Sequence, residues 1–268
     1  MRKKPNILLF ASIVIVLVIG YFIIRSSYFV ENFSSYIKCS AQSTDIGDCI
    51  IYVISWKRVS ENARNVFDAV KRVHDKTFIL NCDENFKMDR GASVIEADDS
   101  FYFTKQMYTL FQHCSDHFPN SPIMTITGDI SPDADWNDII KRCMHGFKKY
   151  GAGIVAPNVD WTAHERHVDI KNMGDNYWTV ENTDCTVWAL KPCVYKFLLN
   201  TDVHTYSKFG WGIDWLLIQV CEKHNMPVIR DYKHTIKHPK DHGYENTTAE
   251  WEKQEVKNKW NSVYQNIV

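Results

Sequence analysis

The sequence predicts a three-layer α/β/α fold with a mainly parallel sheet, preceded by a single N-terminal transmembrane helix. Short apolar runs typical of buried strands alternate with amphipathic helical segments over most of the chain. The 268 residues are 45% hydrophobic and 13% aromatic, which supplies enough side chains for a sizeable core. A separate uncharged apolar run lies near the N-terminus and predicts the membrane helix.

The N-terminal run, Ile7–Ile24, contains 18 residues without a charge and is closed by Arg25. A cleaved signal peptide is the alternative, but its apolar region is usually shorter and ends in a small-residue cleavage site. The basic residues before the run predict a cytoplasmic N-terminus and a type II, single-pass protein with a luminal body. Sequons at Asn32 and Asn246 are compatible with that side of the membrane. The expected organisation is a cytoplasmic tail (1–5), a transmembrane anchor (6–24), a stem (25–48) and a catalytic domain (49–268).

The alternation of strands and helices begins at Cys49. The expected strands are Ile50–Ile54, Thr77–Asn81, Ala92–Ile95, Pro122–Thr127, Gly153–Ala156, Thr186–Leu190 and Pro227–Ile229. The expected helices have apolar residues at helical spacing, which mark segments around 63–73, 107–118, 136–147 and 213–220.

Composition limits the possible partners. The formal net charge is −1, so the chain lacks the basic field that nucleic-acid binding requires. The eight cysteines have no zinc-site spacing, and a luminal body permits disulfides. Cys39–Cys49 and Cys185–Cys193 are the expected local bridges. Cys114, Cys143 and Cys221 are expected to form no disulfide and to act as small hydrophobic residues on the apolar faces of helices.

Ligands of parallel α/β sheets bind outside the carboxyl ends of the strands. The polar residues expected there are Ser55, Asp83, Asp98, Asp129 and the loop after Pro157. Asp83 and Asp98 are candidates for contacts with a base and a ribose, or they are turn residues. Asp129 is a candidate for a metal or phosphate site, or it opens a turn.

Two acidic residues after Asp129 are better explained by helix formation. Asp135 directly precedes the apolar helical stripe that begins at Trp136, and Asp138 follows three residues later. This arrangement predicts Asp135 as an N-cap, and Asp133 favours the same helix start.

The segment Gly210-Trp211-Gly212-Ile213-Asp214 precedes another helix. The glycines permit tight backbone geometry, and Trp211 offers a flat face for a sugar ring. The helix dipole stabilises the anionic form of Asp214 in the first turn. The alternative is an ordinary helix start with a core tryptophan.

Two further candidates lie in loops. His238 follows the last expected strand, although the chain has 11 histidines and His164, His167, His234 and His242 compete with it. Trp161, with His164, Arg166 and His167, occupies a polar loop that binds an acceptor or is simply solvated.

These residues together resemble a family. The run from Cys49 to Tyr244 resembles the GT-A-fold nucleotide-sugar glycosyltransferases of the broad family 2-like group, which have a Rossmann-like core. The most specific element is Gly210–Asp214, because a similar segment in relatives contacts the acceptor and carries the general base. Thr183–Trp188 resembles the strand that leads to it, and His238-Pro239 resembles the stretch whose histidine completes a metal site. The anchor, stem and luminal domain are similar to those of Golgi-type transferases.

One departure concerns the metal motif, which is Asp-x-Asp in the family and Thr127-Gly128-Asp129 here. The resemblance implies Mn²⁺ or Mg²⁺ at Asp129 and His238, and donor contacts at Ser55, Asp83, Asp98, Thr127 and Gly128. It also implies acceptor contacts at Trp161, Gly210, Trp211 and Gly212. Asp214 is implied as the general base of an inverting displacement, and a retaining reaction stays open.

Two other classes of function remain. A membrane-anchored protein that binds a glycan or nucleotide sugar without turnover would also explain the missing first carboxylate. A metal-dependent hydrolase or nucleotidyltransferase is less well supported, because the sequence has no clustered metal ligands and no Gly-rich phosphate loop.

Overall fold

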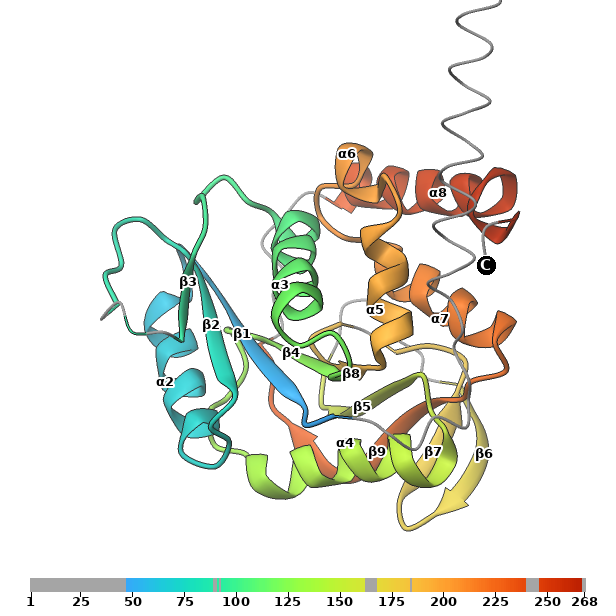
Figure 1. Cartoon of the computed structure of the whole chain (residues 1–268), viewed down its shortest axis with the longest axis horizontal. Coiled ribbons are helices and arrows are strands. Elements are labelled where there is room, and N and C mark those ends of the chain that lie inside the picture. Colours follow the sequence, from blue (N-terminus) through green and yellow to red (C-terminus); the bar gives the residue numbers. More distant parts are fainter. Residues whose placement is uncertain are drawn as a thin grey trace, which may run out of the picture.

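The described part of the chain forms one nine-stranded sheet with helices on both faces (Figure 1). The computed structural model describes residues 47–88, 91, 93–161, 168–183, 185–239 and 246–266. The strand order is β3-β2-β1-β4-β8-β5-β9-β7-β6. The strands are β1 (Ile50–Trp56), β2 (Thr77–Cys82), β3 (Val94–Glu96), β4 (Ile123–Thr127), β5 (Ile154–Val159), β6 (Asp169–Gly174), β7 (Tyr177–Val180), β8 (Val187–Leu190) and β9 (Val228–Ile236).

The helices form the two outer layers. On one face lie α2 (Ser60–Lys71) and α4 (Trp136–Tyr150). The other face carries α3 (Phe103–His117), α5 (Pro192–Leu199), α6 (Val203–Tyr206), α7 (Ile213–Lys223) and α8 (Asn246–Ser262). Figure 1 shows α4 on one side of the sheet and α3, α5 and α7 on the other. The three-layer α/β/α prediction is therefore confirmed.

The sheet is mixed, so the prediction of a mainly parallel sheet is wrong for its second half. Strands β3, β2, β1 and β4 pair in parallel, as do β5 and β9. Strand β8 is antiparallel to both of its neighbours, and β7 is antiparallel to β9 and β6. A short strand that is buried on both faces has the same apolar pattern in either direction, so this reversal could not be predicted from the residues of β8.

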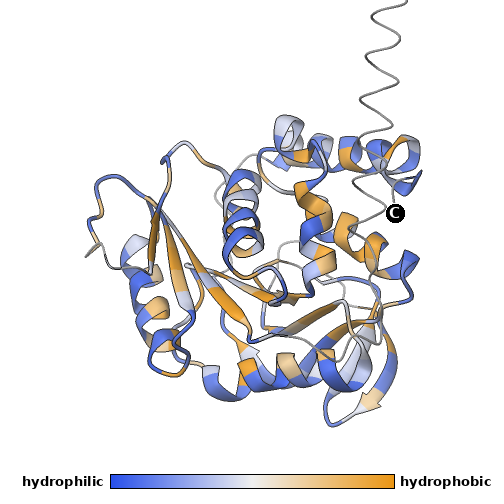
Figure 2. Cartoon of the chain, viewed as in Figure 1, coloured by the Kyte–Doolittle hydropathy of each residue, from blue (hydrophilic) through white to orange (hydrophobic). Residues whose placement is uncertain are grey.

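The two cores follow from the alternation of side chains along the strands. Ile51 and Val53 of β1 pack against α2 and α4, whereas Tyr52 and Ile54 face the opposite layer. In Figure 2 the strands of the central sheet are largely hydrophobic, and hydrophilic residues are concentrated on the outer sides of the helices.

Both predicted local disulfides are wrong. Neither Cys49 nor Cys185 is in a disulfide, while Cys193 is disulfide-bonded and Cys39 lies outside the described residues. Cys185 and Cys193 flank the two ends of β8. An extended four-residue strand separates its ends by about 13 Å, beyond the reach of a disulfide. The interpretation of Cys114, Cys143 and Cys221 as buried free thiols is confirmed.

The predicted anchor at residues 6–24, with the tail and nearly all of the stem, lies outside the described residues. Within the part that the structure describes, no helix combines the length and apolar character needed to cross a membrane.

A buried ion pair joins α4 to the second half of the sheet. The Arg142 guanidinium donates to both carboxylate oxygens of Asp231, from Nε at 2.6 Å and from Nη2 at 2.7 Å. It also donates to the Asp175 carbonyl and lies 4.4 Å from the centre of the Tyr177 ring. The two paired side chains are 9% and 3% exposed, and this contact raises the pKa of Arg142 further above its usual range. The pair therefore fixes β9 and the β6–β7 turn against α4.

We predict that Arg142→Ala lowers the free energy of unfolding by about 3–5 kcal/mol, because Asp231 is left charged and buried. Chemical denaturation measures the change. Lys141→Ala, an exposed neighbour on the same helix, serves as the control. A loss below about 1 kcal/mol for Arg142→Ala would show that the pair is only a surface-type contact.

Candidate functional site

The carboxyl ends of six strands meet at one edge of the sheet. Strands β3, β2, β1 and β4 run in one direction, and β8 runs in the opposite direction between β4 and β5. Strand β5 is therefore parallel to β4, and β9 is parallel to β5. The residues that follow β1, β2, β4, β5 and β9 thus come to the same edge, as predicted for ligand binding.

Asp129 and His238 meet at this edge. His238 Nε2 lies 3.3 Å from Asp129 Oδ2, and the two side chains are 11% and 19% exposed, respectively. Asp129 follows β4, whereas His238 follows β9 at the other end of the domain sequence. The predicted pairing of these two residues is thus present in the geometry.

Two residues after β5 hold His238 in place. The backbone N–H of His238 donates to Asp160 Oδ1 at 2.9 Å. The Trp161 ring stacks on the His238 imidazole, with centroids 5.8 Å apart and an interplanar angle of 10°. Trp161 therefore supports the histidine, and its predicted acceptor contact is untested. The other residues of its loop, His164, Arg166 and His167, lie outside the described residues.

The loop that carries Asp129 is clamped by α2. Asn62 Nδ2 donates to the carbonyls of Gly128 and Ile130, both at 2.7 Å. A Cβ at Gly128 would lie 2.5 Å from both Ala63 Cβ and the Ile54 carbonyl, so no larger residue fits. The backbone at Gly128 therefore packs directly against α2 and β1. These contacts fix the position of the loop that carries the Asp129 carboxylate.

Three buried oxygens beside this loop have no hydrogen-bond partner among the described residues: Ser55 Oγ, Thr127 Oγ1 and Asp129 Oδ1. Their backbones lie near one another because Ile54 and Thr127 are paired between β1 and β4, although the alternation of side chains puts the Ser55 and Thr127 hydroxyls on opposite faces of the sheet. A buried polar atom without a partner costs about 1–3 kcal/mol. A ligand with hydrogen-bond donors or a cation would recover that cost, and this favours a binding site here.

Asp129 and His238 fit a divalent cation as a partial ligand set. Carboxylate oxygens suit Mg²⁺ and Mn²⁺, whereas imidazole is a general metal ligand that suits softer cations better. Over the described residues, no group of three His, Cys, Asp or Glu side chains could hold a metal. The protein alone thus offers two ligands, and a metal bound here needs further oxygens from a substrate.

The carboxylates of Asp83 and Asp98 are engaged in turns. Asp83 is buried and accepts hydrogen bonds from Ser60 Oγ at 2.7 Å and from the Asn85 N–H at 3.1 Å. Asp98 is exposed and accepts from the Ser100 N–H at 2.8 Å. The Ser100 hydroxyl and N–H lower the pKa of Asp98. Both residues are therefore turn residues, which was the alternative to a role in binding. Their contacts with the base and ribose of a nucleotide sugar stay predictions.

The Gly-Trp-Gly segment leads into α7 as predicted. Gly210 and Gly212 have φ values of 82° and 93°, a region that disfavours side chains, and Gly212 is the N-cap of α7. The segment lies at the start of α3, because the Thr104 N–H donates to the Lys208 carbonyl at 3.3 Å. Since α3 follows β3, the segment and Asp214, in the first turn of α7, belong to the carboxyl-edge side of the domain.

The acidic pair after Asp129 has the predicted structural role. Asp135 caps α4 by accepting from the Asp138 N–H at 3.1 Å. Asp133 and Asp135 also line a shallow depression with Arg72 at the end of α2. Ten residues of helix, about 15 Å, separate Arg72 from Asn62, so this depression is distinct from the Asp129 site.

Sequence reasoning missed three supporting residues: Asn62, Asp160 and Glu252. Asp160 carried a usable signal, since it directly follows the buried strand β5. Asn62 is a polar residue on an amphipathic helix and has no distinguishing pattern. Glu252 lies in α8, a helix that the analysis of the sequence did not predict, and it accepts a hydrogen bond from the Phe209 N–H at 2.8 Å.

We predict that Asn62→Ala lowers the free energy of unfolding by about 1–3 kcal/mol, because the carbonyls of Gly128 and Ile130 lose their donor. Thermal and chemical denaturation measure this loss. Asn65→Ala, an exposed residue on the same helix, is the matched control and should change stability by less than about 0.5 kcal/mol. Equal effects of the two substitutions would contradict the clamp.

No protein-family model matches the sequence, and no curated protein matches it. Solved structures with a similar chain path include a UDP-glucose pyrophosphorylase complexed with UDP-glucose, at 9% identity and a TM-score of 0.47, covering 80% of this chain and 99% of that one. The mannosyltransferase PcManGT from Pyrobaculum calidifontis, in complex with GDP-Man and Mn²⁺, matches at 12% identity and a TM-score of 0.47, covering 87% and 70%. TarS 1–349 from S. aureus matches at 9% identity and a TM-score of 0.44, covering 82% and 74%. At these values the similarities assign neither a family nor an activity to this chain.

Proposed function

We propose that this protein is a GT-A-fold glycosyltransferase that moves a sugar from a nucleotide-diphosphate donor to a hydroxyl of a glycan, protein or lipid acceptor. The observation that carries the proposal is the Asp129–His238 contact at the carboxyl edge, next to three buried oxygens that lack partners among the described residues. The helix start that bears Asp214 lies on the same side of the domain.

Asp129 and His238 are the residues proposed to act on the sugar donor. With Mn²⁺ or Mg²⁺ bound, the cation would supply positive charge for the diphosphate leaving group. Asp129 Oδ1 and the His238 imidazole would hold that cation, and Trp161 keeps the imidazole in its orientation by stacking. Ser55 and Thr127 are further candidates for donor contacts. Donor contacts at Gly128, Asp83 and Asp98 belong to this proposal as well.

The acceptor side belongs to the Gly-Trp-Gly segment. The Asp214 carboxylate removes the proton from the acceptor hydroxyl as a general base. The acceptor oxygen then bonds to the anomeric carbon while the bond to the diphosphate oxygen breaks, and the configuration inverts. Trp211 offers an apolar face to the acceptor, between two glycines that let the backbone approach closely. Trp161 is a further candidate for an acceptor contact.

The proposal includes a membrane anchor at residues 6–24. The protein is then a type II membrane protein with its catalytic domain in the lumen of a Golgi- or ER-like compartment. The length of the uncharged run and the basic residues before it support this placement.

One observation favours a second function. Thr127 occupies the position of the first carboxylate in the family motif, and a site with one carboxylate fewer would suit a protein that binds a glycan or nucleotide sugar without turnover. Release of nucleoside diphosphate from a donor in the presence of Mn²⁺ would exclude this alternative.

We predict that Asp214→Asn lowers kcat for sugar transfer by about 10²–10⁴-fold, because an amide cannot take up the acceptor proton. The Kd of the donor should stay within about twofold, since the carboxylate acts on the acceptor. Radiolabelled sugar transfer and donor titration measure the two quantities. Asp133→Asn, an exposed carboxylate outside the site, is the control. Unchanged turnover in Asp214→Asn would reject the base assignment.

We also predict that Asp129→Asn abolishes the Mn²⁺-dependent part of donor binding. An amide binds divalent cations more weakly than a carboxylate does, so the rise in Tm caused by a nucleotide sugar with Mn²⁺ should fall to the rise without Mn²⁺. Differential scanning fluorimetry with and without EDTA measures this difference. An undiminished Mn²⁺ effect in the variant would place the metal elsewhere.

A further inference from the structure

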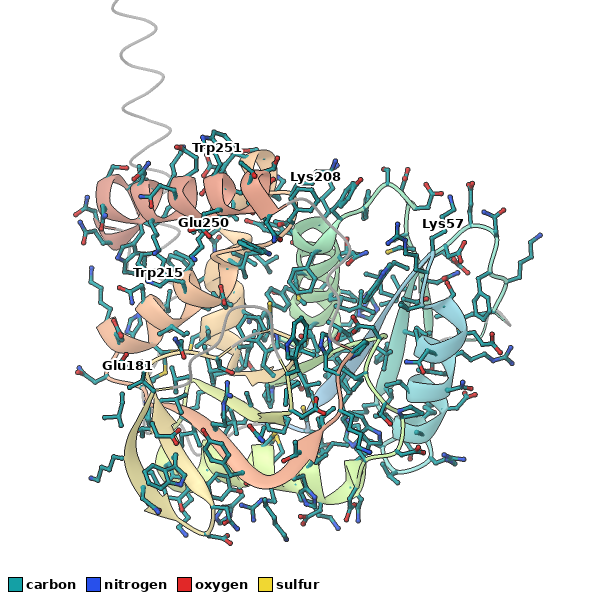
Figure 3. All side chains as sticks on the ribbon, turned by 180° about the vertical axis from the view of Figure 1, so that it is seen from behind. Lys57, Glu181, Lys208, Trp215, Glu250 and Trp251 are labelled. Carbon is teal, nitrogen blue, oxygen red and sulfur yellow. The ribbon has the colours of Figure 1, made fainter. Side chains whose placement is uncertain are left out.

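Helix α8 packs against the segment proposed to contact the acceptor, residues 207–214. In Figure 3 Lys208 marks this segment, and Glu250 and Trp251 mark α8. Glu252, one residue further along the helix, is 3% exposed although it carries a carboxylate. A carboxylate is rarely buried to this extent unless its hydrogen bonds are satisfied.

Glu252 holds the segment before Trp211. Its Oε2 accepts from the Phe209 N–H at 2.8 Å and from Ser207 Oγ at 3.4 Å. Ser207 Oγ in turn lies 3.5 Å from Thr104 Oγ1 at the start of α3. One buried carboxylate thus ties the segment to α8, while α3 holds it from the other side.

The same helix supports the segment after Trp211. A Cβ at Gly212 would lie 3.2 Å from Val256 Cβ and 3.3 Å from Lys253 Cα, so α8 packs directly against the backbone there. Gly210 and Gly212 adopt positive φ values that glycine visits freely but does not maintain by itself. The contacts on both sides of Trp211 therefore restrict a stretch of chain that is intrinsically flexible.

We propose that Glu252 is a positioning residue for the acceptor half of the reaction, an inference that rests on the proposed function. By fixing the Phe209 N–H, it sets the direction in which the chain enters Gly210 and so the placement of Trp211 and Asp214. The hydrogen bonds of Glu252 run to Ser207 and Phe209, which both belong to the acceptor segment. Its loss should therefore affect transfer to the acceptor and leave donor binding intact.

The test compares Glu252→Ala, Glu252→Gln and the control Glu250→Ala in the full chain. Glu250 is exposed, lies two residues before Glu252 and, among the described residues, forms an ion pair with Lys253. The donor Kd with Mn²⁺, the donor hydrolysis rate and the kcat/KM for the acceptor are measured for each. We expect Glu252→Ala to lower the acceptor kcat/KM by at least about tenfold while the donor Kd and hydrolysis stay within about twofold. Glu252→Gln should retain most activity, because its amide carbonyl accepts the Phe209 N–H.

Hydrogen exchange of residues 207–212 gives a second readout that needs no activity. Glu252→Ala should speed exchange of this segment, and Glu250→Ala should leave it unchanged. If Glu252→Ala does not fold, Glu252→Asp replaces it, since the shorter side chain withdraws the carboxylate from Phe209. A wild-type protein without donor turnover would reject the proposed function, whereas unchanged exchange or unchanged transfer in Glu252→Ala, or in Glu252→Asp if it replaces it, would overturn this inference.

Discussion

The contact between Asp129 and His238 is the constraint on which the candidate site depends. It joins two loops that follow strands β4 and β9, which are separated in the sheet by β8 and β5. The pair forms only because β8 reverses direction and lets β5 and β9 run parallel to β4. The Arg142–Asp231 ion pair helps to fix β9, and Asn62 fixes the loop after β4. Structural interactions outside the pair itself thus help to determine the distance between its two residues.

Burial explains why this edge is suited to a ligand. Ser55, Thr127 and Asp129 each keep a buried oxygen that no described residue satisfies, whereas the carboxylates of Asp83 and Asp135 are satisfied by local hydrogen bonds. The fold therefore separates carboxylates that stabilise turns and helix starts from one that is left available. This distinction is chemical and cannot be made by position in the sequence, because all three aspartates follow a strand or precede a helix.

Most of the layer structure could be predicted from the sequence, since buried strands and amphipathic helices have distinct periodicities. The β6–β7 hairpin could not, because β6 is exposed along nearly its whole length and has no apolar alternation. Helix α8 was missed for a related reason. Its buried residues, Ala249, Glu252, Val256 and Trp260, include only one large apolar pair in a polar segment, and the buried glutamate contradicts the usual pattern. Within the site, Asp129 and His238 were predicted from their places after strands, whereas Asn62 and Glu252 act through hydrogen bonds to distant backbone groups.

The proposed function requires Asp129 and His238 to hold a divalent cation together with a diphosphate, and anomalous diffraction would locate that cation. Crystals of the protein grown with Mn²⁺ and a nucleoside diphosphate would be measured at the manganese edge. We expect one manganese peak between Asp129 Oδ1, His238 Nε2 and the diphosphate oxygens. A bound nucleotide whose manganese lies away from both residues would contradict it.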